Sequence, residues 1–354
     1  WFDVLTPKQA MLFLALGRTL RDQYNCEIIY TTREHDYIQD IFSHAKEKAY
    51  TFGKYGGKNL GDKLLASAKR VLDLSKFIIS KQADNKQFLS ISFSSPDASR
   101  VAFGLGMPIL LLNDTAHSKP VGKLTFSLAN YLVTPDCIDK DIFSSLGAQK
   151  EIIHQYHGVD ELEYLTGKNY QSFKKLKTTF IDKVEERYIV FRPEESFASY
   201  MKEGMDELYL EILQHLLQCT DKTIRVFPRY EKQAEIISSR FKNQVEIASK
   251  GYHYLDLFSK ADVVITGGGT MGREAALLGI PSITYFWRQL EPQTFIEKEG
   301  FPSFSSQSLT RTKGLISDIC QNPEKYSMNT ENMLESLEKP SDIIIPLLKK
   351  NNYL

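Results

Sequence analysis

The chain has 354 residues, of which 42% are apolar and 25% are charged, the composition of a globular protein long enough for two domains. It carries 44 Lys and Arg against 44 Asp and Glu, and this zero formal net charge argues against a nucleic-acid partner. The four cysteines lie far apart and form no Cys/His ligand pattern, so we expect no metal site.

The first half of the chain alternates short apolar segments, which predict strands, with amphipathic segments, which predict helices. In chain order the expected strands are residues 1–5, 27–31, 49–52, 88–93, 108–112, 131–134 and 152–156. The expected helices are residues 10–24, 35–46, 59–80, 97–104 and 124–128. This alternation predicts a parallel sheet with helices on both faces.

The same pattern starts again in the second half. Strands are expected at 188–191, 223–227, 245–247, 261–266 and 281–285, and helices at 200–219, 231–241, 254–259, 271–278, 313–321, 330–337 and 343–350. We therefore predict an α/β fold of two Rossmann-like doubly wound domains that face each other across a cleft. The expected boundaries are 1–165 for the first domain, 166–187 for a polar connection, 188–335 for the second domain, and 336–354 for a C-terminal helix that packs back on the first domain.

The strongest local signal is the turn Gly267-Gly268-Gly269-Thr270 between a strand and a helix. Glycine allows positive φ and close approach to a ligand, and the helix N-terminus attracts anions. Thr270 is expected to cap the helix or to bind a phosphate. Glu274, one turn further on, is placed to accept hydrogen bonds from a ribose. The alternative is a tight turn that binds nothing, but three adjacent glycines cost conformational entropy, which favours the ligand interpretation.

Other polar residues of the second half follow predicted strands. Arg192 could pair with a diphosphate or form an interdomain salt bridge. Arg229 and Tyr230 could flank a nucleobase or phosphate, or belong to a surface turn. His253 could lie against a nucleobase, although simple packing explains it better.

Two motifs carry a resemblance to known families. Residues Gly267–Pro281 resemble the donor-binding segment of GT-B glycosyltransferases and UDP-N-acetylglucosamine 2-epimerases, where a Gly/Ser-rich turn holds the diphosphate of a nucleotide sugar. The turn His157-Gly158-Val159-Asp160 resembles the Asn-Gly-Val-Asp turn of GT-B proteins, with His157 in place of Asn. Nearly the whole chain looks like a largely archaeal GT-B-like family known as a domain of unknown function, including Leu5–Ala10, Ser94–Ala98 and Asn113-Asp114.

The resemblance implies a glycosyltransferase that takes sugar from a nucleotide-diphosphate sugar, with UDP as the first nucleotide to test and no further cofactor. The donor would bind the second domain, and a glycan, lipid-linked or small-molecule acceptor the first. The alternatives are a nucleotide-sugar 2-epimerase or hydrolase and a non-catalytic nucleotide-binding protein. The first-domain His and carboxylate motifs typical of the epimerases are not intact, which weakens that alternative.

Sugar transfer with inversion needs a general base, and Asp97, Asp114 and His117 all follow predicted strands of the first domain. Asp114 could orient His117 or act itself; otherwise Asp114 caps a helix and His117 lies on the surface. Lys8 is expected at the cleft with His157, where it could touch an anionic group, or it is an ordinary residue at a helix start.

No apolar segment is long enough to span a membrane, and the N-terminus has no signal-peptide pattern. We therefore expect a cytoplasmic protein. Peripheral membrane contact through the apolar residues 126–132 is an open expectation that core packing explains equally well.

Overall fold

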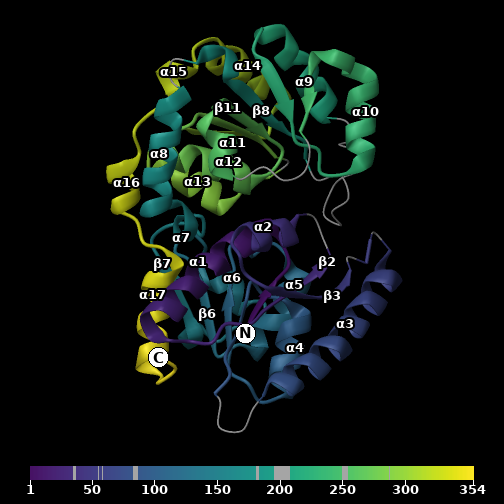
Figure 1. Cartoon of the computed structure of the whole chain (residues 1–354), viewed down its shortest axis with the longest axis vertical. Coiled ribbons are helices and arrows are strands. Elements are labelled where there is room, and N and C mark those ends of the chain that lie inside the picture. The colour runs from purple at the N-terminus through teal and green to yellow at the C-terminus, as the bar shows by residue number, and fades with distance from the viewer. Residues whose placement is uncertain are drawn as a thin grey trace. The chain divides into compact units, whose positions relative to one another are not determined.

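The computed structural model describes residues 1–34, 37–54, 56–57, 59–82, 87–180, 183–194, 208–248, 254–286 and 288–354. These residues form two compact units, each α/β (Figure 1). The first unit contains residues 1–164 and 337–354, and the second contains residues 165–336.

The first unit is built on a seven-stranded parallel sheet with the order β3-β2-β1-β4-β5-β6-β7. Its strands are β1 (Phe2–Val4), β2 (Tyr30–Glu34), β3 (Ala49–Lys54), β4 (Ser90–Ser92), β5 (Ile109–Leu112), β6 (Tyr131–Pro135) and β7 (Ile153–Tyr156). Phe2 pairs with Tyr30 on one side and with Ile91 on the other. The strand order therefore reverses between β1 and β4, the position at which open α/β sheets bind ligands beyond their carboxyl ends.

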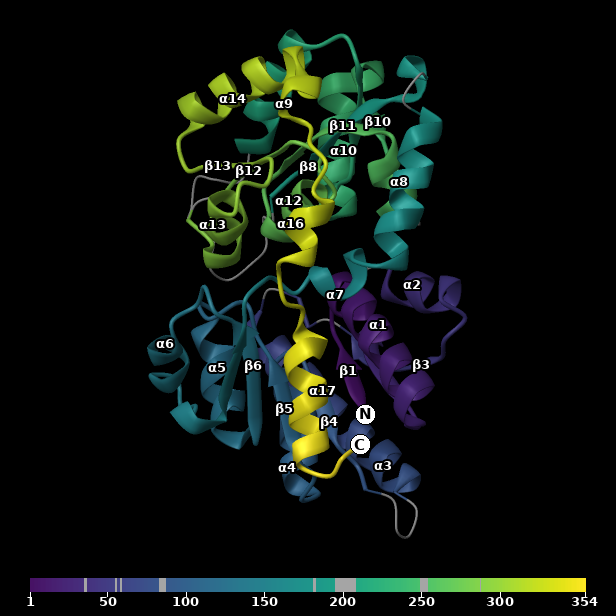
Figure 2. The ribbon, with the colours of Figure 1, turned by 90° about the vertical axis from the view of Figure 1, so that its left-hand side faces the viewer.

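Helices connect these strands. They are α1 (Pro7–Tyr24), α2 (Ile38–His44), α3 (Leu60–Lys81), α4 (Pro96–Gly104), α5 (Lys119–Thr125), α6 (Lys140–Ser144) and α7 (Leu162–Leu165). The hydroxyl of Thr6 accepts the Gln9 amide and caps α1, and Asn59 caps α3. The last helix, α17 (Pro340–Lys350), packs against β6 and β7 of this first unit (Figure 2).

A charged network explains why an aspartate stands in the central strand β1. Asp3 is fully buried, and its carboxylate accepts hydrogen bonds from Arg70, Thr31 and Ser95. Arg70 is 2% exposed and reaches Asp3 from α3. Burial acts to raise the pKa of Asp3, but the Arg70 guanidinium and the two hydroxyls hold that pKa below its ordinary value.

The second unit has a six-stranded parallel sheet with the order β10-β9-β8-β11-β12-β13. Its strands are β8 (Tyr188–Arg192), β9 (Thr223–Val226), β10 (Glu246–Ile247), β11 (Ala261–Thr266), β12 (Ser282–Tyr285) and β13 (Ser303–Ser306). Val264 pairs with Val190 on one side and with Ser282 on the other. The strand order of this sheet reverses between β8 and β11.

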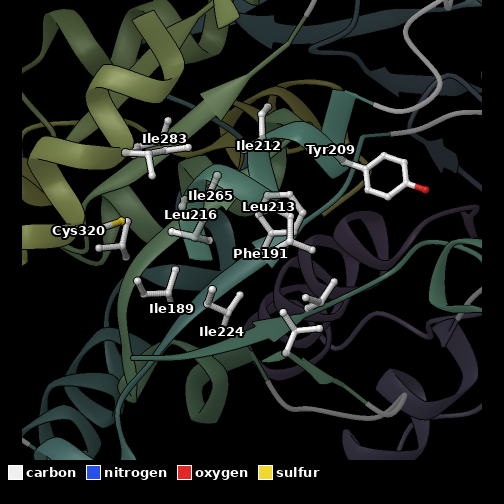
Figure 3. Packing of buried hydrophobic residues seen from close by; sticks show 14 of the residues in the cluster. Ile189, Phe191, Tyr209, Ile212, Leu213, Leu216, Ile224, Ile265, Ile283 and Cys320 are labelled. Carbon is white, nitrogen blue, oxygen red and sulfur yellow. The ribbon is translucent and has the colours of Figure 1, made fainter. Parts of the chain in front are cut away.

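Apolar side chains from alternate strand positions meet the helices on one face of this sheet. Ile189, Phe191 and Ile265 pack with Leu213 and Leu216 of α9 (Leu208–Cys219), as Figure 3 shows. The remaining helices are α8 (Lys168–Phe180), α10 (Glu231–Phe241), α11 (Tyr254–Ser259), α12 (Gly269–Leu277), α13 (Glu291–Lys298), α14 (Leu309–Gln321), α15 (Pro323–Tyr326) and α16 (Glu331–Glu335). The two α/β sheets confirm the predicted fold class.

Several local expectations differ from the structure. Residues 168–180, expected in the connection, form α8, which buries Tyr170 and Phe173 and packs against α11. Strand β13 and helices α6, α7, α13 and α15 were not predicted. The strand expected at 27–31 runs from Tyr30 to Glu34 instead.

The apolar segment 126–132 belongs to the core of the first unit. Phe126 is 1% exposed and Leu132 is fully buried, so they are not surface residues available to a membrane. Among the described residues, no helix combines the length and apolar character that a membrane span requires.

Candidate functional site

The glycine turn follows β11, one of the two strands at the reversal point of the second sheet. The Gly267 amide donates to the carbonyl of Arg192, and the Gly268 amide donates to the Thr266 hydroxyl. Gly268 is the N-cap residue of α12, and no side chain caps the helix. The first-turn amides of α12 therefore point out of the helix end, an arrangement that attracts anions.

Of the two alternatives for Thr270, helix capping is wrong and phosphate binding stays a prediction. Thr270 lies inside the helix and does not cap it, because the helix already begins at Gly269. None of the three glycines of the turn adopts positive φ. Close approach by other residues explains the glycines instead: an ideal Cβ on Gly267 would lie 2.6 Å from the Cα of Glu194.

Two guanidinium groups lie beside the glycines. A Cβ on Gly268 would lie 2.5 Å from Nη2 of Arg229, and one on Gly269 would lie 2.7 Å from Nη1 of Arg273. The Arg229 side chain is also held by a hydrogen bond of 2.9 Å from Nε to the carbonyl of Pro193. The N-terminus of α12 therefore combines helix amides with two cations, and its first turn contains no acidic residue.

The other predicted residues of this unit lie at varied positions. Arg192 ends β8, pairs with Thr266 in register and is half-buried. Tyr230 is half-buried and precedes α10. Glu274 lies in α12 with only 5% of its surface exposed, so a contact with a ribose stays a prediction. His253 lies outside the described residues.

In the first unit, Lys8 joins two carboxylates that follow different strands. Its Nζ lies 2.6 Å from Oδ2 of Asp114, after β5, and 2.7 Å from Oδ2 of Asp160, after β7. The ammonium also lies 4.5 Å from the centre of the Phe93 ring. Asp160 is 1% exposed and Asp114 is 9% exposed, so the cluster is shielded from solvent.

One cation between two buried carboxylates favours a proton on the cluster. Burial raises the pKa of Asp160 to about 7, opposed by Lys8 and assisted by the charges of Asp114 and Glu161. The Tyr156 hydroxyl donates to the other oxygen of Asp160, and burial raises the pKa of Tyr156 well above its ordinary value. A carboxyl group that titrates near neutral pH is suited to act as a general acid or base.

Asp97 pairs with a cation other than Lys8. Its Oδ2 lies 3.2 Å from Nη1 of Arg70, and its Oδ1 accepts the Ser67 hydroxyl. Asp97 therefore belongs to the network that neutralises Arg70 and Asp3, and its catalytic role stays a prediction.

The two histidines take different places. His117 is half-buried in the turn that follows Asp114. His157 is half exposed, and its Nδ1 lies 2.7 Å from Oδ2 of Asp136. The side chain that reaches Lys8 comes from Asp160, three residues after His157.

Four residues of these sites were absent from the predicted set: Asp160, Thr266, Arg273 and Glu194. The signal for Asp160 was available, because it is a polar residue directly after a strand in the His-Gly-Val-Asp turn. Arg273 carried no such signal, since a single arginine inside a helix does not indicate which way its side chain folds.

Solved structures of other proteins share this fold. UDP-GlcNAc 2-epimerase from Neisseria meningitidis, bound to UDP-GlcNAc, is 16% identical with a TM-score of 0.72, and the match covers 99% of each chain. UDP-GlcNAc 2-epimerase from Methanocaldococcus jannaschii, in complex with UDP-GlcNAc and UDP, is 14% identical with the same TM-score and the same coverage. Anabaena Alr3699/HepE in complex with UDP-glucose is 14% identical with a TM-score of 0.62, over 100% of this chain and 99% of that one.

Sequence comparison identifies the family. The uncharacterized protein MJ0665 of Methanocaldococcus jannaschii is 27% identical over 294 residues, which cover 82% of each chain. The family described as protein of unknown function (DUF354) matches residues 1–343. The chain therefore belongs to the DUF354 family and has the GT-B-like fold that the resemblance implied.

Proposed function

We propose that this protein binds a UDP-sugar through the glycine turn of its second unit and transfers the sugar to an acceptor. The observation that carries the proposal is the uncapped N-terminus of α12, with Arg229 and Arg273 beside Gly268 and Gly269. The likeness to proteins solved with UDP-GlcNAc and UDP-glucose supports a ligand of this class.

The chemistry of transfer fits such a site. As the bond from the sugar to the diphosphate breaks, negative charge grows on the leaving group, and helix amides with guanidinium groups stabilise it there. Glu274 would accept hydrogen bonds from the ribose. Asp114 and Asp160 are the groups we assign to proton transfer, because burial raises the pKa of Asp160 to about 7. The acceptor would be a glycan, a lipid-linked molecule or a small molecule.

A second candidate is epimerisation or hydrolysis of the nucleotide sugar without an acceptor. Two of the solved structures with this fold are UDP-GlcNAc 2-epimerases that match over 99% of each chain. Epimerisation next to the anomeric carbon removes and returns a proton, and a carboxyl group that titrates near neutral pH suits both steps.

The first experiment is a thermal-shift panel with UDP, GDP, CDP, dTDP and ADP. A ligand present at about 100 times its Kd adds about 2.7 kcal/mol of stability. We expect UDP to raise the melting temperature of the protein, and Glu274→Ala and Arg229→Gln to reduce that shift. No response to any nucleotide would reject the nucleotide-binding proposal.

Product analysis then separates the two reactions. NMR spectra of UDP-GlcNAc and UDP-glucose incubated with the protein alone would reveal a C2 epimer or free sugar if no acceptor is needed. Unchanged sugar without acceptor, and consumption with an acceptor panel, supports transfer. Binding without turnover under both conditions would favour a non-catalytic nucleotide-binding protein.

A further inference from the structure

Helix α3 presents a row of large apolar side chains to solvent. Leu64 and Leu65 are each 70% exposed, and Leu72 and Ile79 are each 54% exposed. The helix lies at the outer edge of the first unit, where its buried side contacts β3 and α4 (Figure 1). Large apolar side chains gathered on one exposed helix face indicate a surface that another molecule covers.

The exposed face of α3 has the spacing of a coiled-coil seam. Its positions alternate at intervals of four and three residues, which keeps them on one side of a helix. This α3 seam consists of Gly61, Leu65, Ala68, Leu72, Ser75 and Ile79, which are exposed or half-buried. The buried residues Arg70, Leu74 and Ile78 lie on the other side of the helix. The Ser75 hydroxyl donates to the carbonyl of Val71, so it is already satisfied if a partner covers it.

The sizes of the side chains in the α3 seam favour pairing with a second copy of the same helix in the antiparallel direction. When two copies of α3 are paired about a point near residue 70, the facing pairs are Leu72 with Ala68, Leu65 with Ser75, and Ile79 with Gly61. Each large side chain then meets a small one, as close packing requires. In the parallel direction each residue would face its own copy, so leucines would crowd each other and the small residues would leave gaps.

The charges beside the α3 seam suit the same arrangement. Asp62 and Lys76 lie on one flank of the seam, toward its two ends. Antiparallel pairing places Asp62 of each copy beside Lys76 of the other, so the two-fold symmetry produces two pairs of opposite charge. Lys69 lies between them and meets its own copy near the axis, where its long side chain extends into solvent.

We propose that this protein forms a homodimer through α3, with the seams of two copies packed antiparallel about a two-fold axis. The same surface is used by both copies, so the assembly closes at two chains. Helix α3 belongs to the first unit and the glycine turn to the second, so the proposal does not depend on what binds at the glycine turn.

Light scattering after size-exclusion chromatography of the full chain measures the assembly. We expect twice the 40.5 kDa mass of one chain. Leu72→Glu should weaken the dimer at least about tenfold, because it would bury a carboxylate without a partner. The matched control is Leu124→Glu on α5 of the same unit, where the leucine is 61% exposed, and it should leave the mass unchanged. A monomeric wild type, or a dimer that survives Leu72→Glu, would overturn the proposal.

Exchange of charges tests the antiparallel register. Asp62→Lys and Lys76→Asp should each weaken the dimer, because each substitution places like charges side by side. A mixture of the two variants at low ionic strength should form heterodimers at least about tenfold more tightly than either variant forms homodimers, since both opposite-charge pairs are then restored. The two positions lie about 21 Å apart along one helix, so the rescue has to arise between copies. Sedimentation velocity of the mixture that shows no rescue would reject this pairing.

Ala68→Leu separates a second copy from a lipid surface as the partner of α3. The added side chain would clash with Leu72 of the second copy, so the dimer should weaken at least about tenfold, and a further Leu72→Ala should restore it. On a lipid surface Ala68→Leu would strengthen binding, because it adds apolar area. Stronger binding of Ala68→Leu to phosphatidylglycerol vesicles, with no loss of a dimer, would overturn the proposal. Far-UV circular dichroism of each variant verifies that it folds.

Discussion

Gly267 lies directly against the backbone of Glu194: an ideal Cβ on Gly267 would sit 2.5 Å from the Cβ of Glu194 and 2.6 Å from its backbone nitrogen. The close approach follows from the pairing of β8 with β11, which brings the two strand ends together. A Cβ on Gly268, in contrast, would come closest to the flexible end of the Arg229 side chain. The glycines of the turn therefore have different roles, one in packing and the other beside the cationic site.

This difference predicts opposite effects for two alanine substitutions. Gly267→Ala should destabilise the protein by about 1–3 kcal/mol, because main-chain atoms must shift to admit the methyl group. Gly268→Ala should keep a melting temperature close to that of the wild type but weaken UDP binding about tenfold, because it displaces the Arg229 guanidinium. Thermal denaturation and UDP titration measure the two effects. Equal melting temperatures for the variants would contradict the packing role of Gly267.

The raised pKa of Asp160 predicts a pH-dependent stability. The folded-state pKa of about 7 lies above the ordinary value of 3.8, so between these values the folded protein holds a proton that the unfolded chain releases. The stabilisation from this group is complete below the ordinary value and is lost as pH rises through about 7. Asp160→Asn does not titrate and serves as the reference.

The stability of the wild type relative to Asp160→Asn should therefore be greater at about pH 5 than at about pH 8. Thermal denaturation of both proteins at the two pH values provides the measurement. A difference that grows with pH would mean that the Lys8 ion pair outweighs burial and holds the pKa of Asp160 low.

Lys8 lies within ion-pair distance of both Asp114 and Asp160. Lys8→Met should destabilise the protein by about 3–5 kcal/mol near neutral pH, because it leaves two buried carboxylates without this cation. The loss should be smaller at about pH 5, where Asp160 holds a proton. Lys8→Arg, which keeps the charge, is the control for the melting experiment. If the loss of stability in Lys8→Met did not depend on pH, the role of Lys8 would be packing alone.

Asp97 and Asp114 offer a matched pair of variants. Asp97→Asn weakens the ion pair with Arg70 and should lower stability by about 1–3 kcal/mol while leaving turnover of the nucleotide sugar intact. Asp114→Asn should lower turnover about 100-fold or more if Asp114 takes part in proton transfer. Rate measurements on both variants, with melting temperatures as a check of folding, distinguish the roles. Loss of turnover in Asp97→Asn at normal stability would support the predicted catalytic role of Asp97.

Much of the fold could be predicted from the sequence. Parallel sheets that are covered on both faces need largely apolar, buried strands, such as Ala261–Thr266. Strand β13 escaped prediction because three of its four residues are serines, and pairing with β12 rather than β propensity decides its conformation. Helix α8 was not predicted because most of its residues are polar. Only two of its aromatic residues, Tyr170 and Phe173, are buried.

The sequence by itself determined the alternation of strands and helices, the place of the glycine turn, and the polar residues that end the strands. Each of these depends on local periodicity or on the chemistry of a few adjacent residues. Only the tertiary structure decided the partners: Lys8 meets Asp114 and Asp160, which lie 106 and 152 positions away. It also assigned Asp97 to Arg70 and folded Arg273 against Gly269. The order of the strands in a sheet differs from their order in the chain. The order in the sheet decides which strand ends become neighbours.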